Sequence, residues 1–333
     1  MPDPSTQEGG GLVTRDQAMP MEGRLQVFSG NANLALATDI AACLNLNLGR
    51  ALVSTFKNGE TRIKIEENVR GSDVFIVQPT CTPVNDNLMQ LLLLIDAVKR
   101  ASAARITAVI PYYGYAKQEK KTTGREPISA KLVANLIRTA GAHRVLTMDL
   151  HAPAIEGFFD IPVDHLQAGQ LLSDYVRSLN LKDPVVISPD AGGVGRANIF
   201  RERIGASLAI IAKQRPRPDA VEMLEMVGDV KGRPAVIVDD MISTGGTLVE
   251  ATRSLLQRGA TKVYACATHG IFAGDGISAL RDSELIETII TDTIPLDPSA
   301  AQARIKSISV APLFAEAILR IHKDLSLSAL FQN

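Results

Sequence analysis

The residues best placed for chemistry lie between positions 235 and 248. Four apolar residues, 235–238, predict a buried parallel strand. Two carboxylates, Asp239 and Asp240, follow this strand, and a turn of small and hydroxyl-bearing residues leads into a helix near Leu248. Ligands of open α/β sheets bind outside the carboxyl ends of the strands. The segment therefore predicts a ligand site at this edge of a sheet.

The turn has the chemistry of a phosphate site. It comprises Ser243, Thr244, Gly245, Gly246 and Thr247. Small side chains let backbone N–H groups approach an oxyanion, both glycines can adopt φ > 0, and the helix N-terminus adds partial positive charge. The preceding aspartates are negatively charged and would repel a phosphate. Sugar hydroxyls, bound directly or through a divalent cation, are therefore their natural partners. We expect a phosphosugar site rather than an acid-capped strand–turn–helix, and without Gly-Lys-Ser/Thr the turn is not a Walker A loop.

Two further side chains follow predicted strands in the same way. Asp190 comes after strand 184–187 and precedes a pair of glycines, and His151 comes after strand 144–148. A magnesium ion needs one or two carboxylates together with phosphates and water, so Asp190 suits that role, although it could equally cap a helix. His151 is the one histidine in such a loop, and we expect the other four to be structural or exposed.

Two basic segments could bind a nucleotide. Lys213 and Arg215 stand among prolines and a further arginine after the predicted strand 208–211, which describes a mobile, positively charged flap. Such a flap could close over ATP and stabilise charge on phosphoryl oxygens, whereas the simpler interpretation is a solvated basic loop. In segment 109–129, Lys117 and other cations stand among three tyrosines, which suits a nucleotide or a subunit contact.

The surrounding elements predict two related α/β halves. A strand, a polar loop, a helix and a second strand over residues 72–110 repeat the layout of residues 235–267. The first copy lacks the aspartate pair and the Gly-Gly turn, so we expect one phosphosugar loop per chain. Ahead of both copies we expect strand 24–28, helix 31–46 and a hairpin around Asn58-Gly59.

The bulk composition describes a globular protein and excludes several classes. The chain has 333 residues, of which 46% are hydrophobic and 21% charged, which suits two domains. The net charge of −1 gives no electrostatic case for nucleic-acid binding, and no apolar run is long enough for a membrane span. Three scattered cysteines without metal spacing indicate free thiols in a reducing cytoplasm. We expect a cytoplasmic protein.

The segment 235–248 resembles the phosphoribosyl diphosphate-binding loop of type I phosphoribosyltransferases. From about Arg24 to the C-terminus, the pattern is most similar to the ribose-phosphate diphosphokinases, or PRPP synthetases. The resemblance implies an α/β fold of two similar phosphoribosyltransferase-like domains, each a mainly parallel sheet flanked by helices. We expect a disordered tail at 1–23 and a first domain at 24–167, which carries the ATP side and the oligomer contacts. A second domain at 168–308 carries the ribose 5-phosphate loop and the flap, and a C-terminal helix at 309–333 packs back on the first domain.

The resemblance also implies an activity and a set of site residues. The activity is transfer of the β,γ-diphosphoryl group of Mg-ATP to the C1 hydroxyl of ribose 5-phosphate, giving PRPP and AMP. The implied residues are Lys213 and Arg215 for catalysis; Lys117 and Gln118, with Asn58, Gly59 and Glu60 of a neighbouring subunit, for ATP; Arg215, Asp239, Asp240, Ser243, Thr244, Gly245, Gly246 and Thr247 for ribose 5-phosphate; and His151 and Asp190 for magnesium. A homo-oligomer, a hexamer built from dimers, and regulation by phosphate and ADP are also implied, with Arg70 as a candidate for the regulatory anion site.

Two positions depart from the family's usual pattern. Lys117 stands where the family usually has arginine, whose planar guanidinium stacks on adenine better than an ammonium does. Ser243 stands where aspartate is common, and its hydroxyl and backbone N–H still suit a phosphate, so we expect binding to persist. Two rival functions remain: a phosphoribosyltransferase that consumes PRPP without ATP, and a non-catalytic family member that regulates active synthetases.

Overall fold

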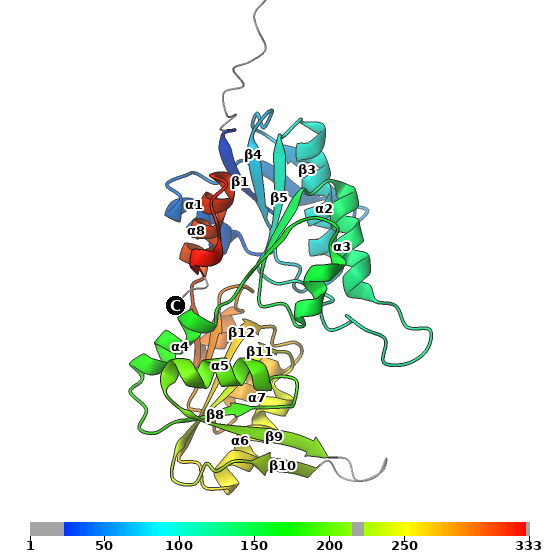
Figure 1. Ribbon diagram of the computed structural model, residues 1–333. Coiled ribbons are helices and arrows are strands. Elements are labelled where there is room, and N and C mark those ends of the chain that lie inside the picture. Colours follow the sequence, from blue (N-terminus) through cyan, green and yellow to red (C-terminus); the bar gives the residue numbers. More distant parts are fainter. Residues whose placement is uncertain (1–22, 215–222, 331–333) are drawn as a thin grey trace, which may run out of the picture.

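The computed structural model describes residues 23–214 and 223–330. Within these ranges the chain forms two α/β units that lie end to end (Figure 1). Each unit is built on a parallel or mainly parallel sheet flanked by helices, which confirms the predicted fold class. The limits between domains remain predictions.

The first unit contains a five-stranded parallel sheet in the order β1-β4-β5-β6-β7. The strands are β1 (Leu25–Ser29), β4 (Asp73–Val77), β5 (Arg105–Ile110), β6 (Arg144–Met148) and β7 (Val163–Leu166), and the helices are α1 (Leu34–Cys43), α2 (Val84–Arg100), α3 (Ser129–Ala140) and the short η1 (Pro153–Phe158). Every residue of β4 is buried because helices cover both faces of the sheet, and this explains its unbroken apolar run. Phe75 packs with α1, whereas Ile76 packs with α2 and α3.

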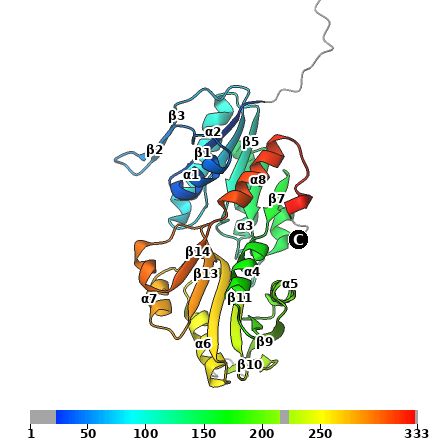
Figure 2. The same cartoon turned by 90° about the vertical axis from the view of Figure 1, so that its left-hand side faces the viewer.

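A separate hairpin projects from the first unit (Figure 2). Strands β2 (Ala51–Thr55) and β3 (Thr61–Ile65) pair antiparallel and form their own two-stranded sheet. Gly59, at the tip, has φ +91°, a backbone conformation that glycine adopts readily. The hairpin predicted from Asn58-Gly59 is confirmed, and its tip is exposed to solvent.

The second unit contains a seven-stranded sheet in the order β10-β9-β8-β11-β12-β13-β14, parallel except for the β10–β9 pair. The strands are β8 (Val185–Ser188), β9 (Ser207–Gln214), β10 (Met223–Val227), β11 (Pro234–Ile242), β12 (Lys262–Gly270), β13 (Glu287–Thr291) and β14 (Ile305–Ile308); the helices are α4 (Gly169–Ser178), α5 (Val194–Ile204), α6 (Gly246–Gln257), α7 (Gly276–Arg281) and the short η2 (Pro298–Gln302). The short η3 (Ser328–Leu330) comes at the end of the described chain, where Ser328 borders a cavity with Arg144 and Asp164 of the first unit. Strands β7, β10, β13 and β14 were not predicted from the sequence.

The last long helix, α8 (Ala311–His322), lies against the first unit beside α1 (Figure 1). Its carboxyl end is fixed by buried charge. Arg105 pairs with Asp73 at 2.5 Å and donates to the carbonyl oxygen of Ile321 at 2.8 Å, and His322 contacts Asp73 at 2.9 Å. The chain thus returns from the second sheet to the first. None of the helices described has the length and apolar character needed to cross a lipid bilayer.

Strand β11 is longer than predicted. The apolar run suggested a strand over 235–238, but pairing with β12 continues as far as Ile242, opposite Gly270. Both aspartates therefore lie inside a strand rather than after it. Successive side chains of a strand point to opposite faces, so Asp239 and Asp240 have different surroundings.

Candidate active site

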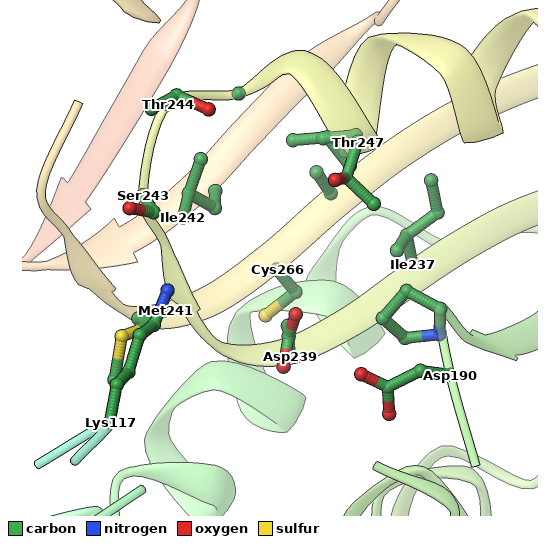
Figure 3. Close-up of a pocket in the computed structure, with 14 residues that line it drawn as sticks. Lys117, Asp190, Ile237, Asp239, Met241, Ile242, Ser243, Thr244, Thr247 and Cys266 are labelled. Carbon is green, nitrogen blue, oxygen red and sulfur yellow. The ribbon is translucent and has the colours of Figure 1, made fainter. Parts of the chain in front are cut away.

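A cavity of about 340 Å³ opens beside the turn that follows β11. Its lining combines the predicted phosphosugar residues with side chains from elsewhere: Asp239, Ser243, Thr244, Gly245 and Thr247 from β11, the turn and α6, Asp190 from the loop after β8, and Lys117 from the first unit (Figure 3). Cys266 of β12 lies at the base of the cavity, close to Asp239 in the same view. Most of the predicted phosphosugar residues therefore face one space that both units help to enclose.

The turn itself is shaped for an anion. Gly245 has φ +78° and directly precedes α6, whereas Gly246 is already the first helical residue. Only one of the two glycines therefore uses the freedom that the sequence suggested. No side chain among the described residues caps this end of α6, so its first N–H groups are available to a ligand. Together with the helix dipole, they make the turn a site for a phosphate.

The two aspartates differ in their exposure and in their contacts. Asp239 lines the cavity, whereas Asp240 is only 4% exposed and is hydrogen-bonded through Oδ2 to Nδ1 of His151 at 2.7 Å. Arg196 bridges them, with Nη1 3.2 Å from Asp239 Oδ1 and 3.4 Å from Asp240 Oδ1. Asp240 is therefore held by protein partners in this arrangement, and only Asp239 is directed at the cavity.

The charges of this cluster follow from burial and pairing. Burial, reinforced by the neighbouring carboxylate of Asp240, raises the pKa of Asp239. Burial also acts to raise the pKa of Asp240, but hydrogen bonds with His151 and Asp239 and the charge of Arg196 outweigh it, so this pKa lies below its ordinary range. The same hydrogen bond raises the pKa of His151. The contact therefore favours the charged forms of both Asp240 and His151, and Asp239 is the carboxylate that gains most from a hydroxyl or cation in the cavity.

The predicted magnesium residues lie on different sides of Asp239. Asp190 lines the first cavity, and its Oδ1 also accepts a hydrogen bond from the backbone N–H of Gly193 at 2.8 Å. This bond lies in the turn before α5, and Asp190 is not the N-cap of that helix, whose N-cap residue is Gly193. His151 lines a second cavity of about 360 Å³, which Asp239 also borders. Among the residues described, no three His, Cys, Asp or Glu side chains form a metal cluster. Magnesium needs fewer protein ligands when phosphates and water complete its shell, so Asp190 with Asp239 fits such an ion.

The other histidines have structural partners, as expected. The contacts are His143 with the backbone N–H of Ile106, His165 with the N–H of Leu150, His269 with Thr293, and His322 with Asp73. His269 is completely enclosed, and burial lowers its pKa.

The residues predicted for ATP are not gathered within one chain. Lys117 lies at the phosphosugar cavity, and the neighbouring Gln118 accepts a hydrogen bond from Ser129 Oγ at 2.5 Å. Residues 58–60 lie at the tip of the β2–β3 hairpin, and Gly59 borders a different cavity, near the start of α2. Lys117 and Gly59 thus border different cavities of this chain.

The predicted flap is described only in part. Lys213 is the penultimate residue of β9 and pairs through its backbone with Leu224 of β10. Arg215 lies outside the described residues.

Sequence reasoning missed Arg196, which holds both aspartates. A signal was present, because Arg196 stands six residues after Asp190 and in the first turn of a helix that follows a strand of the same sheet. Only the packing of α5 beside β11 shows that the guanidinium reaches the aspartates.

Comparisons with known proteins place these features in a family. Residues 25–141 match the family model described as the N-terminal domain of ribose phosphate pyrophosphokinase, and residues 213–332 match the phosphoribosyl synthetase-associated domain. The ribose-phosphate pyrophosphokinase of Caldanaerobacter subterraneus subsp. tengcongensis is 56% identical over 308 residues, which are 92% of this chain and 98% of that protein. That of Gloeobacter violaceus is 51% identical over 310 residues, 93% of each chain. The crystal structure of phosphoribosylpyrophosphate synthetase from Mycobacterium smegmatis is similar with a TM-score of 0.86 and 41% identity, over 90% of this chain and 99% of that one.

Proposed function

This chain belongs to the ribose-phosphate pyrophosphokinase family, and on that premise we propose that it transfers the β,γ-diphosphoryl group of Mg-ATP to the C1 hydroxyl of ribose 5-phosphate. The products are 5-phosphoribosyl 1-diphosphate and AMP. The observation that carries the proposal is the 340 Å³ cavity, where an anion-binding turn, the carboxylates of Asp239 and Asp190, and Lys117 converge. This combination suits a phosphorylated sugar beside a nucleotide.

In the proposed complex, the turn from Ser243 to Thr247 holds the 5-phosphate. Free N–H groups at the start of α6 and the hydroxyls of the turn supply the donors. Asp239 accepts hydrogen bonds from the ribose hydroxyls, which compensates its burial. Asp240 reaches the sugar only when its contact with His151 opens. Holding the phosphate and the hydroxyls together fixes the direction of the C1 oxygen, and such positioning is a large part of catalysis.

The nucleotide side is assigned to Lys117 and Gln118 of one chain and to residues 58–60 of a neighbouring chain. The projecting hairpin (Figure 2) supports this division, because its tip is exposed and residues 58–60 do not line the cavity that contains Lys117. Leu132 and Leu136 of α3 are both exposed and stand one helical turn apart, so they form an apolar stripe that suits a subunit contact. A homohexamer is the proposed assembly. Arg70, which is also exposed, is the proposed contact for regulatory phosphate or ADP.

Lys213 and Arg215 are proposed to stabilise the negative charge that develops on the phosphoryl oxygens during transfer. The C1 oxygen attacks the β-phosphorus in line, the bond to the α-phosphate oxygen breaks, and AMP leaves while the hydroxyl proton passes to solvent. Fixed cations near the phosphoryl oxygens stabilise such a transition state more than the ground state. The position of Lys213 on β9, in the sheet that carries Asp239, supports this role.

Magnesium is assigned to Asp190, beside Asp239 in the first cavity, and to His151, which lines the second cavity, with substrate phosphates and water completing the shell. Bound there, the ion would neutralise phosphate charge and lower the pKa of the attacking hydroxyl. His151 Nδ1 is engaged with Asp240, so Nε2 is the nitrogen left for this role. The enzyme is proposed to work in the cytoplasm.

The deciding assay uses the purified chain with ATP, ribose 5-phosphate and magnesium chloride. Chromatography should show AMP and 5-phosphoribosyl 1-diphosphate in equal amounts, and AMP should be absent when ribose 5-phosphate is omitted. A phosphoribosyltransferase would instead consume 5-phosphoribosyl 1-diphosphate and a base without ATP. An assembled protein that releases no AMP would refute the proposal and favour a regulatory family member.

A further inference from the structure

Two residues of the second sheet hold the loop that carries His151. Thr268 Oγ1 donates a hydrogen bond to Asp149 Oδ2 at 2.6 Å, and His269 Nε2 lies 3.2 Å from the carbonyl oxygens of both Met148 and Asp149. Thr268 is 3% exposed and His269 is 1% exposed. Met148 ends β6 of the first sheet, so these contacts join the carboxyl ends of the two sheets. They are shielded from water, which strengthens them.

Asp149 has a backbone conformation that needs such support. Its φ is +38°, which is uncommon for a residue other than glycine. Its N–H donates to the carbonyl oxygen of Leu166 at 3.0 Å, and its Oδ2 also accepts from the N–H of Ala168 at 3.0 Å. Asp149 lies two residues before His151, so its conformation sets the direction in which His151 leaves β6.

The donors in the second sheet are themselves held in place. His269 Nδ1 lies 2.9 Å from Thr293 Oγ1, and Thr291 Oγ1 donates to the carbonyl oxygen of Thr268 at 2.7 Å. The ring of Tyr112, from the loop that leads to Lys117, packs edge-on against His269 with 5.1 Å between ring centroids. This end of β12 is therefore a rigid support rather than a free surface.

The loop is attached to the second sheet at two neighbouring points. The register of the parallel ladder sets Asp240 on β11 beside Thr268 on β12, since the residues on either side of them are paired. Asp149 contacts Thr268, while His151, two residues further on, contacts Asp240. Adjacent strands are about 4.8 Å apart, so the two points of attachment lie one strand spacing apart on the second sheet.

We propose that Thr268 and His269 are positioning residues that keep His151 at the active site when Asp240 exchanges His151 for substrate. The proposal rests on the proposed function, in which Asp240 binds the ribose only after its contact with His151 opens and His151 helps to hold magnesium. Their mutual contact must then loosen during each cycle. The Thr268–Asp149 contact uses neither side chain and persists throughout.

The test compares Thr268→Val, which keeps the shape but removes the hydroxyl, with Thr268→Ser, which restores it. In the assembled enzyme, Thr268→Val should lower kcat at least fivefold with little change in the KM for ribose 5-phosphate, and Thr268→Ser should recover most of the loss. Thr147→Val is the matched control, because Thr147 is buried on β6 and donates to Ile110 within its own sheet. An equal loss of kcat in the control, or no loss in Thr268→Val, overturns the proposal.

A second measurement does not depend on turnover. The side chain of His151 is 35% exposed, so diethylpyrocarbonate can modify it at a rate followed by mass spectrometry. Thr268→Val should raise this rate at least threefold, whereas Thr268→Ser and Thr147→Val should not. An unchanged modification rate in Thr268→Val overturns the proposal, and a raised rate supports it. Failure of the wild-type chain to release AMP would refute only the proposed function. If Thr268→Val does not assemble, Thr268→Ala takes its place with the same criteria.

Discussion

Replacing Gly245 by alanine tests whether the turn after β11 depends on its left-handed residue. Gly245 has φ +78° and ψ −16°, and a Cβ there would lie 3.4 Å from the carbonyl oxygen of Gly276, an ordinary contact. The cost is therefore conformational rather than steric. An L-residue in this region costs about 1–2 kcal/mol relative to glycine. The part of this cost that the turn retains lowers the stability of the fold, and the part that it relieves by moving its donors lowers affinity for ribose 5-phosphate, by up to about 5- to 30-fold.

Two other glycines provide controls. Gly246 is helical, and a Cβ there would be no nearer than 3.9 Å to Thr244 Oγ1, so Gly246→Ala should not destabilise the fold. Both substitutions remove the same freedom from the unfolded chain, so their difference isolates the left-handed cost. Gly232 has φ +73° and open space around it, in the turn before β11. Gly232→Ala should lose similar stability but keep its affinity for ribose 5-phosphate.

Thermal unfolding and isothermal titration calorimetry with ribose 5-phosphate complete the test. Gly245→Ala should melt roughly 2–8 °C below Gly246→Ala, given about 2–4 °C per kcal/mol for a unit of this size. It should also bind more weakly than Gly232→Ala. Equal melting temperatures for Gly245→Ala and Gly246→Ala would refute the backbone argument. Equal affinities for Gly245→Ala and Gly232→Ala would show that the turn does not hold the phosphate.

Three further predictions follow from the site. Lys213→Ala should reduce turnover by about two to three orders of magnitude while ribose 5-phosphate binding stays nearly intact; near-normal turnover would exclude the proposed role of Lys213. Lys117→Arg should keep activity and equal or improve the apparent KM for ATP, and a sharp loss would mean that the nucleotide pocket is built differently. Burial raises the pKa of Cys266 and favours its neutral thiol. At pH 8 a thiol reagent should therefore label exposed Cys43 and spare Cys266, and rapid labelling of Cys266 in a Cys43→Ser variant would contradict this.

The sequence alone determined the features that depend on neighbouring residues. Apolar runs marked β4 and the first half of β11, Asn58-Gly59 marked the hairpin, and the small residues from Ser243 to Thr247 marked an anion-binding turn. Each of these follows from local periodicity or from the backbone freedom of a few residues. The resemblance carried by the same residues agreed with the family shown by the comparisons.

The tertiary structure decided which of these residues face one another. The ladder with β12 extends β11 to Ile242, so both aspartates lie within the strand, with Asp239 at the cavity and Asp240 against His151. Asp240 meets His151 across 89 positions of sequence, and Lys117 of the first unit joins the cavity of the second. A sequence pattern shows which face of a strand a residue occupies only when the limits of the strand are known. Here pairing with β12, a strand distant in the sequence, set those limits.

The same reason explains why the cross-sheet contacts escaped sequence analysis. Thr268 and Asp149 look like ordinary residues at strand ends, and nothing local predicts that the carboxyl ends of two sheets meet there. The packing of whole units, including the return of α8 to the first sheet, brings those ends together. Sequence thus determined the chemical groups of the site, and the docking of the two sheets determined their partners, because contact between distant segments depends on how complete elements pack.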